Sequence, residues 1–177
     1  GSCGKNKKDL ANNPLLKEWN SPFGTPPFDK IQPKDYIPAF EEGMRVHNEE
    51  IDAIMNNKEA ANFKNTIEAY DLSGELLAKV SGVFFNMTSC NTNEELQKLE
   101  EKIGPMVAKH GDEITMNAKL FERVKKVWDN KDKEKLNKEQ QMLLDKTYKK
   151  FVRSGALLNK EKQEKQNLKY FFFFFFN

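Results

Sequence analysis

The sequence predicts an all-α protein, in which an antiparallel, bundle-like layer of helices follows an extended, proline-rich arm. Two observations predict this class. Apolar residues recur at spacings of three, four and seven after Pro33, the period of one helix face. No segment alternates apolar and polar residues between turn pairs, as strands of a half-buried sheet would. A content of 38% hydrophobic and 32% charged residues allows a sizeable core.

The first 32 residues are expected to lack a long helix. Residues 1–12 are polar and Lys-rich, which is typical of a flexible tether. In the arm at 13–32, Gly24 followed by Pro26 and Pro27 precludes a continuous helix. The arm carries more apolar residues than a free linker needs, so we expect it to pack on the helices. These residues are Leu15, Leu16, Trp19, Phe23, Phe28 and Ile31.

Residues 33–169 are expected to form one helical domain. A helix over 33–57 tolerates Pro38 in its first turn, where the missing N–H costs little. Its inward residues are Ile37, Phe40, Met44, Ile51 and Ile54. A second helix over 66–89 carries few charges in its later part and should be the most buried element. Its inward residues are Leu72, Leu76, Val80, Val83, Phe84 and Met87.

Three further helix starts are predicted from capping residues. Thr92 or Asn93 can accept hydrogen bonds from the first turn of the third helix, and Thr92 with Glu95 matches a capping box. That helix carries the stripe Leu96, Leu99, Ile103, Met106 and Val107, and the pair Gly104-Pro105 should kink it. Asn117 is expected to cap a fourth helix, with Leu120, Phe121, Val124, Val127 and Trp128 inward.

After a polar loop at 129–137, Asn137 is expected to start a helix that ends near Gly155. Its inward residues are Leu143, Leu144, Thr147, Tyr148, Phe151 and Val152. Asn159 then begins a further polar helix that runs into YFFFFFFN, residues 170–177. The run Phe171 to Phe176 is far shorter than the roughly 20 apolar residues that cross a bilayer. We assign it no function and interpret it as an end introduced by cloning, a frame change or an uncertain residue assignment.

Charge argues against nucleic acid as a partner. The formal net charge is only +2, and three of the 29 basic residues are Arg, namely Arg45, Arg123 and Arg153. Bidentate recognition of phosphate depends on the guanidinium fork, which Lys lacks. The late cluster of Lys is interrupted by Glu161 and Glu164 and is interpreted as a solvated helix face.

No catalytic or metal-binding residue is predicted in this chain. The only histidines are His47 and His110, so a zinc-peptidase HExxH helix is absent from the sequence. Each is followed three residues later by Glu, at Glu50 and Glu113, but di-metal bundles use the reverse order, Glu-x-x-His. We therefore interpret both histidines as exposed or half-buried helix residues.

The two cysteines predict neither a disulfide framework nor a structural zinc site. Cys90 is interpreted as a small residue near a helix end. Cys3 opens a polar stretch in the manner of a mature bacterial lipoprotein, and is a possible lipid-attachment residue. The alternative is that Gly1-Ser2 is a cloning remnant placed after a removed signal peptide. Both predict export to the bacterial envelope, either periplasmic or lipid-anchored.

Several blocks in order resemble the N-terminal portion of the zinc peptidyl-dipeptidases, the family that includes oligopeptidase A, thimet oligopeptidase and neurolysin. The residues that carry the resemblance are PPFDKI at 26–31, YIPAF at 36–40, NTI at 65–67, the run from Val83-Phe84-Phe85 to Asn91-Thr92-Asn93, LFERVKKVWDN at 120–130 and TYKKFVRSGALL at 147–158. The match covers roughly residues 13 to 168. The chain departs from the family pattern at YFFFFFFN.

The resemblance implies part of a zinc enzyme that removes C-terminal dipeptides from short peptides. The family's helical N-terminal portion forms one wall of a deep channel that gates substrate access, and its zinc-binding residues lie downstream of the matched region. We therefore expect this segment to be inactive alone, to lack zinc, and to pair with a catalytic half. A truncated layer should self-associate through its exposed face. The alternative is a standalone helical binding or scaffold module.

Overall fold

The computed structural model describes residues 5–19, 24–91 and 93–175, and every regular element in these ranges is helical. The predicted all-α class is confirmed, since no strand occurs in the described residues. The chain divides into two compact units where the sequence predicted one helical domain over 33–169. Unit 1 comprises Gly1–Ala53 and Leu72–His110, and unit 2 comprises Ile54–Asp71 and Gly111–Asn177.

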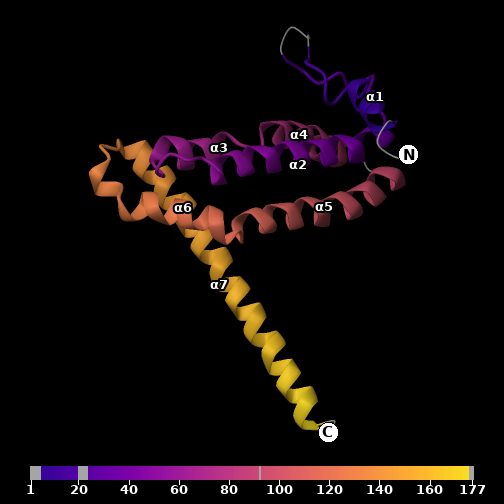
Figure 1. Ribbon diagram of the computed structural model, residues 1–177. Helices are drawn as coiled ribbons and strands as arrows, with labels where there is room; N and C mark the ends of the chain where they lie inside the picture. The colour runs from indigo at the N-terminus through magenta and orange to yellow at the C-terminus, as the bar shows by residue number, and fades with distance from the viewer. Residues whose placement is uncertain (1–4, 20–23, 92, 176–177) are drawn as a thin grey trace. The chain divides into compact units, whose positions relative to one another are not determined.

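Unit 1 contains α1 (Lys5–Ala11), α4 (Glu75–Cys90) and most of α2 (Pro33–Met55) and α5 (Glu94–Thr115). The helices α2, α4 and α5 run in alternating directions (Figure 1). A Cβ at Gly43 would lie 3.0 Å from the Leu77 backbone, so the missing side chain permits the close approach of α2 and α4. The core joins Leu15, Tyr36, Ala39, Phe40, Leu77, Val80, Val83, Phe84, Leu96 and Ile103.

The arm packs on this core. Leu15 is fully buried, and Leu16, Trp19 and Ile31 pack partly buried against the same cluster. Asn13 fixes the arm, because its Nδ2 donates to the carbonyl of Asp35 at 2.8 Å. Phe28 is exposed, and Phe23 lies outside the described residues. Helix α1 lies within the segment expected to be a flexible tether, where KNKKDLA is rich in good helix formers.

Unit 2 contains a π-helix, η1 (Phe63–Glu68), α6 (Ala118–Asp129), the 3₁₀-helix η2 (Lys131–Lys133) and α7 (Lys138–Phe175). The short α3 (Ala69–Leu72) continues η1. Helix α6 contacts α7 and η1. Aromatic rings fill much of the seam between α6 and α7. Trp128 stacks on Tyr148 with 4.3 Å between ring centroids, and Phe121 stacks on both Tyr148 and Phe151.

The helix predicted over 66–89 is helical but interrupted, since residues 66–72 lie in η1 and α3 and α4 begins only at Glu75. The chain is interrupted at Ser73-Gly74, where Gly74 has φ +77, a conformation that disfavours residues with a side chain. The interruption changes the helix phase, so Leu72 is 67% exposed while Leu77 is buried. Farther along, Val80, Val83 and Phe84 are buried as predicted.

The predicted end near Gly155 and the new start at Asn159 are also wrong. Helix α7 runs through both positions without a break to Phe175. Gly155 does not have a positive φ, so it does not form the left-handed cap that ends many helices. The predicted inward residue Val152 is 42% exposed. The backbone of Phe171 to Phe175 is helical, and Phe176 lies outside the described residues.

Most predicted caps are present. Asn93 and Asn117 each accept a hydrogen bond from the backbone N–H three residues later, at 2.8 and 3.1 Å. Asn137 and Gln140 exchange two such bonds at 2.9 Å. Thr92, the other candidate cap, lies outside the described residues. Helix α5 continues through Gly104-Pro105.

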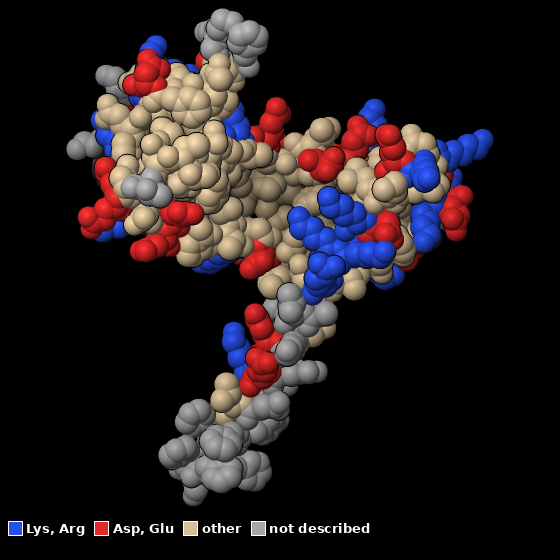
Figure 2. All heavy atoms as spheres, turned by 180° about the vertical axis from the view of Figure 1, so that it is seen from behind, with Lys and Arg blue, Asp and Glu red and all other residues tan. Residues whose placement is uncertain are grey.

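Charged side chains are mixed over the surface. Figure 2 shows Lys and Arg beside Asp and Glu, with uncharged areas between them, on the face in view. This distribution accords with a net charge of only +2. Within the described part of the chain, none of the helices combines the length and apolarity that a membrane span requires.

Candidate functional site

The main polar cluster inside unit 1 forms around the two histidines. His47 belongs to the middle of α2 and His110 to the later part of α5, 63 residues away in sequence. The Nδ1 atom of His47 lies 2.8 Å from the Nε2 atom of His110. The other nitrogen of His47, Nε2, lies 3.2 Å from the hydroxyl oxygen of Ser73. Three segments of unit 1 are therefore joined by one chain of hydrogen bonds.

The turn before α4 is held against α2 by this cluster. A Cβ on Gly74 would lie 3.0 Å from the His47 ring, so the glycine lets the imidazole pack directly on the backbone. One turn farther along α2, Glu50 accepts a hydrogen bond from the Gly74 N–H at 3.3 Å. The Ser73-Gly74 turn thus contacts α2 through a ring, a hydroxyl and a carboxylate. These contacts explain why the helical pattern breaks at this position.

Burial differs between the two rings. His110 is only 6% exposed, whereas His47 is half-buried. The interpretation of both as exposed or half-buried residues is therefore confirmed for His47 and wrong for His110. A buried imidazole must find hydrogen-bond partners, because an unsatisfied polar group costs about 1–3 kcal/mol. The contact with His47 supplies one, which explains how α5 accommodates a polar residue there.

The pair works in either of two tautomeric arrangements. A neutral imidazole has one N–H donor and one acceptor nitrogen. If His47 donates through Nδ1, its Nε2 accepts from the Ser73 hydroxyl. If His110 donates through Nε2, His47 instead donates to the Ser73 oxygen. In both arrangements at least one ring must be uncharged, because a ring with two N–H groups has no acceptor.

The described residues do not fit a zinc site. A zinc ion in a protein takes three or four side-chain ligands, with Zn–N distances of about 2.0–2.1 Å. No group of three or more His, Cys, Asp or Glu side chains suited to a metal occurs among the described residues. The 2.8 Å separation of the two imidazole nitrogens is that of a direct hydrogen bond.

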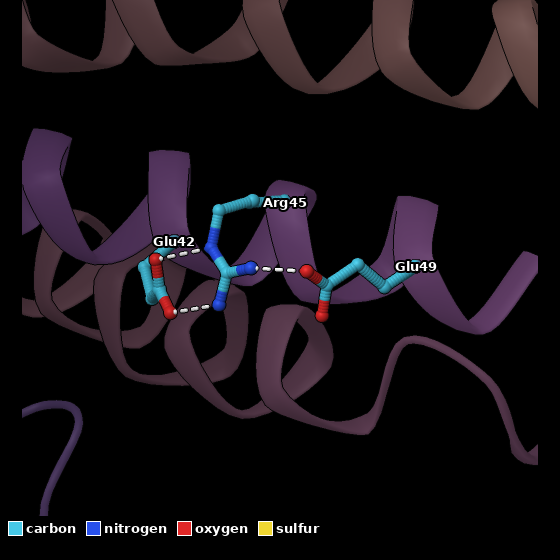
Figure 3. A network of polar contacts seen from close by, with 3 residues as sticks. All are labelled: Glu42, Arg45 and Glu49. Atoms are coloured by element: carbon cyan, nitrogen blue, oxygen red, sulfur yellow. Dashed lines mark hydrogen bonds and ion pairs between the residues drawn. The ribbon is translucent and has the colours of Figure 1, made fainter. Parts of the chain in front are cut away.

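A second polar network lies on α2. Arg45 binds Glu42 with two parallel hydrogen bonds, from Nε at 2.9 Å and from Nη2 at 2.6 Å, and its Nη1 binds Glu49 (Figure 3). The hydrogen bonds from Arg45 lower the pKa of the Glu42 carboxyl. The Arg45 and Glu49 side chains are 55% and 66% exposed, so this network is a surface feature of one helix.

In unit 2 the corresponding polar anchor is Arg123. Its Nη1 donates to the backbone carbonyls of Asn57 and Glu59, at 3.1 and 3.3 Å. Its Nη2 donates to the side chain of Asn65 at 3.3 Å. Asn65 is itself part of a capping box with Asn62, which starts the π-helix. Arg123 therefore ties the loop after α2 and the start of η1 to α6.

The remaining predicted site residue, Cys3, lies outside the described residues. Cys90 is the last residue of α4 and is an exposed free cysteine, as its interpretation near a helix end anticipated. Sequence reasoning missed the His47–His110 contact. The one available signal was that both residues fall on predicted helices with the same His-x-x-Glu spacing, but spacing within a helix does not tell which helices meet.

No family model matches the chain. Among curated proteins, the dipeptidyl carboxypeptidase of Salmonella typhimurium is 41% identical over 152 residues, which is 86% of this chain and 22% of the relative. The dipeptidyl carboxypeptidase of Escherichia coli is 41% identical over 146 residues, 82% of this chain and 21% of the relative. Oligopeptidase A of Escherichia coli is 24% identical over 153 residues, 86% of this chain. The chain spans about a fifth of the length of these relatives.

Proposed function

This chain is related in sequence to the N-terminal portion of the dipeptidyl carboxypeptidases, and we propose that it forms a channel wall in such a peptidase, gating the access of short peptides. The observation that carries the proposal is the 41% identity over 152 residues. The peptidase releases dipeptides from the carboxyl ends of its substrates, and zinc and its ligands belong to a catalytic part outside this chain. By itself the chain is inactive.

The architecture of unit 1 is consistent with the proposed role as a channel wall. Its core joins α2, α4 and α5 with the arm, so the layer has a hydrophobic core of its own. The His47 cluster adds a directional constraint, because hydrogen bonds fix the position of α5 and the Ser73-Gly74 turn on α2. A layer held in this way can keep the shape of a channel while peptides enter and leave.

A chimera tests the proposal. The matched 146 residues of the Escherichia coli dipeptidyl carboxypeptidase are replaced by the corresponding residues of this chain, and dipeptide release from a blocked short peptide is measured with and without a chelator. We expect chelator-sensitive release by the chimera and none by this chain alone supplied with zinc. Zinc-dependent hydrolysis by the isolated chain would overturn the inactivity of the segment.

If the chimera does not fold, a second measurement tests the proposal. The reading frame after Asn177 in the source DNA is sequenced. An extension that encodes HExxH supports the peptidase, whereas a true stop codon with intact expression supports the standalone helical binding or scaffold module.

Two further parts of the proposal concern the environment of the chain. Cys3 and the polar stretch after it support export to the bacterial envelope, with Cys3 as the lipid-attachment residue. Mass spectrometry of the native N-terminus tests this, and an unmodified Cys3 rules out the lipid. Self-association of the isolated chain belongs to the same proposal, through the apolar face that would meet the catalytic part. Light scattering that finds only monomer at high concentration contradicts it.

A further inference from the structure

Unit 2 contains a pocket that the proposed function does not use. Its volume is about 310 Å³, and it is formed where α6, η2 and the beginning of α7 meet. The residues that line it are Trp128, Lys131, Asp132, Gln141, Leu144 and Asp145. Small-molecule sites in proteins start at about 300 Å³ and combine an apolar surface with a few polar groups that converge on the ligand. This pocket is therefore suited only to a small ligand.

The apolar part of the pocket is a fixed aromatic wall. The Trp128 ring is stacked on Tyr148 at an interplanar angle of 6°, so Tyr148 supports one face of the indole. Leu144 is 1% exposed and belongs to the packed interior of unit 2. Since Tyr148 covers one face of the indole and the Lys131 ammonium lies over the ring, a ligand side chain can contact only the edge of the Trp128 ring.

Charges of both signs stand beside the aromatic wall. The Lys131 ammonium lies 3.7 Å from the centroid of the Trp128 ring, and Lys131 forms no ion pair with any described residue. Asp132, its neighbour on η2, makes no hydrogen bond or ion pair with the described residues either. Asp145 already binds Lys149 through Oδ2 at 2.7 Å. The unpaired ammonium of Lys131 and the unpaired carboxylate of Asp132 are therefore available to a ligand.

We propose that this pocket binds a small zwitterion with an apolar side chain, namely an unblocked dipeptide. Its carboxylate pairs with Lys131, its ammonium pairs with Asp132, and its side chain packs against the edge of the Trp128 ring. A free amino acid has the same two charges, closer together. The choice of a dipeptide rests on the proposed function, since a dipeptidyl carboxypeptidase releases dipeptides, and it assigns to unit 2 a product-binding site separate from catalysis.

Fluorescence of Trp128 gives a direct readout. The chain has two tryptophans, so Trp19→Phe leaves Trp128 as the only emitter. The protein is titrated with alanyl-leucine, N-acetyl-alanyl-leucine, alanyl-leucine amide and free leucine. We expect a saturable change with alanyl-leucine and a dissociation constant about fivefold to tenfold weaker for each blocked form, because each loses one charge pair. Tighter binding of leucine than of alanyl-leucine would assign the site to amino acids and overturn the dipeptide.

Two substitutions assign the charges. Asp132→Asn should weaken alanyl-leucine about fivefold and leave the N-acetyl form unchanged, since that form has no ammonium to lose. Lys131→Gln should weaken the N-acetyl form and leave the amide unchanged. Lys133→Gln is the matched control, because Lys133 lies on the same 3₁₀-helix but does not line the pocket. The denaturation midpoint of each variant is measured to show that unit 2 remains folded.

No saturable change up to the solubility limit of alanyl-leucine would overturn the site. An equal response to alanyl-leucine and to both blocked forms would overturn its recognition of charge. Neither measurement involves hydrolysis, so failure of this site is distinguishable from failure of the chimera described above. Binding by the isolated chain with an inactive chimera would retain the site and reject the peptidase.

Discussion

Both units anchor their helices through buried or half-buried polar groups, but the groups differ in their chemistry. Unit 1 joins α2, α5 and the turn before α4 through two imidazoles and a hydroxyl. Unit 2 joins α6 to the loop at Asn57 and Glu59 through the guanidinium of Arg123, which is charged at any ordinary pH. Both histidines of the sequence lie in unit 1. We therefore expect the stability of unit 1, rather than that of unit 2, to depend on pH near neutrality.

The two units also differ in how their aromatic rings pack. In unit 1 the rings meet edge to face, with Phe84 4.9 Å from Tyr36 and 5.5 Å from Phe40 between centroids. In unit 2 the rings of Phe121, Tyr148 and Trp128 are stacked. Each unit also holds one tryptophan, Trp19 or Trp128. Replacing either with Phe lets fluorescence report the unfolding of the other unit alone.

The largest expected effect is that of Phe84→Ala. Phe84 is fully buried and contacts both Tyr36 and Phe40, so the substitution should lower the unfolding free energy of unit 1 by about 3–5 kcal/mol. Denaturant unfolding followed by Trp19 in a Trp128→Phe background measures it. Phe85→Ala, at a 38% exposed position on the same helix, is the control and should cost far less. An equal loss reported by Trp128 in a Trp19→Phe background would show that the two cores are not energetically separate.

Arg123→Met should be next, and it should act on unit 2. The change removes charged hydrogen bonds to the carbonyls of Asn57 and Glu59 and should cost about 1.5–3 kcal/mol. Trp128 fluorescence in a Trp19→Phe background measures it. Arg123→Lys should recover only part of the loss, because an ammonium cannot reproduce the planar fork. Full recovery by Lys would mean that charge, not geometry, holds the loop.

His110→Leu should destabilise unit 1 by about 1–2 kcal/mol at pH 8, because it leaves Nδ1 of His47 without its partner. The cost should shrink at pH 5. The contact needs at least one uncharged ring, because an imidazole with both nitrogens protonated has no acceptor, so the hydrogen bond is lost once both rings have taken up a proton.

The control for that prediction is the stability of unit 2, measured at the same two pH values. Unit 2 contains no histidine among its residues, so its midpoint should change little between pH 8 and pH 5. A cost of His110→Leu that is identical at both pH values would reject the proton-dependent contact. It would leave the ring with a packing role only.

Glu42→Gln should have the smallest effect. The hydrogen bonds from Arg45 lower the pKa of Glu42, so the stabilisation is present above the ordinary carboxyl pKa and lost as the pH falls through the lowered value. The Arg45 side chain is 55% exposed, and solvent screens such pairs. Acid denaturation of unit 1 with and without added salt measures it. A large effect that survives high salt would contradict a surface role.

The fold class and most of the helices can be predicted from the sequence alone. Apolar residues on one face make a helix stable only against a core, so the stripes that include Phe40, Ile103 and Val124 predicted residues that are buried. Caps were equally readable, because Asn117 bonds to an N–H three residues away in its own chain segment. Capping hydrogen bonds join residues only three positions apart, so the spacing of residues in the sequence is enough to predict them.

The positions where the helical pattern breaks, and the polar residues that meet, depend on contacts between segments far apart in the sequence. Gly74 interrupts a helical stretch because the His47 ring occupies the place of its side chain, and no property of residues 66–89 reveals that ring. Gly155 stays helical because nothing requires it to turn. His110 is buried because its partner stands on another helix, 63 residues earlier. Contacts between distant segments depend on how helices pack, and that packing is set by the whole core rather than by the spacing of residues along one element.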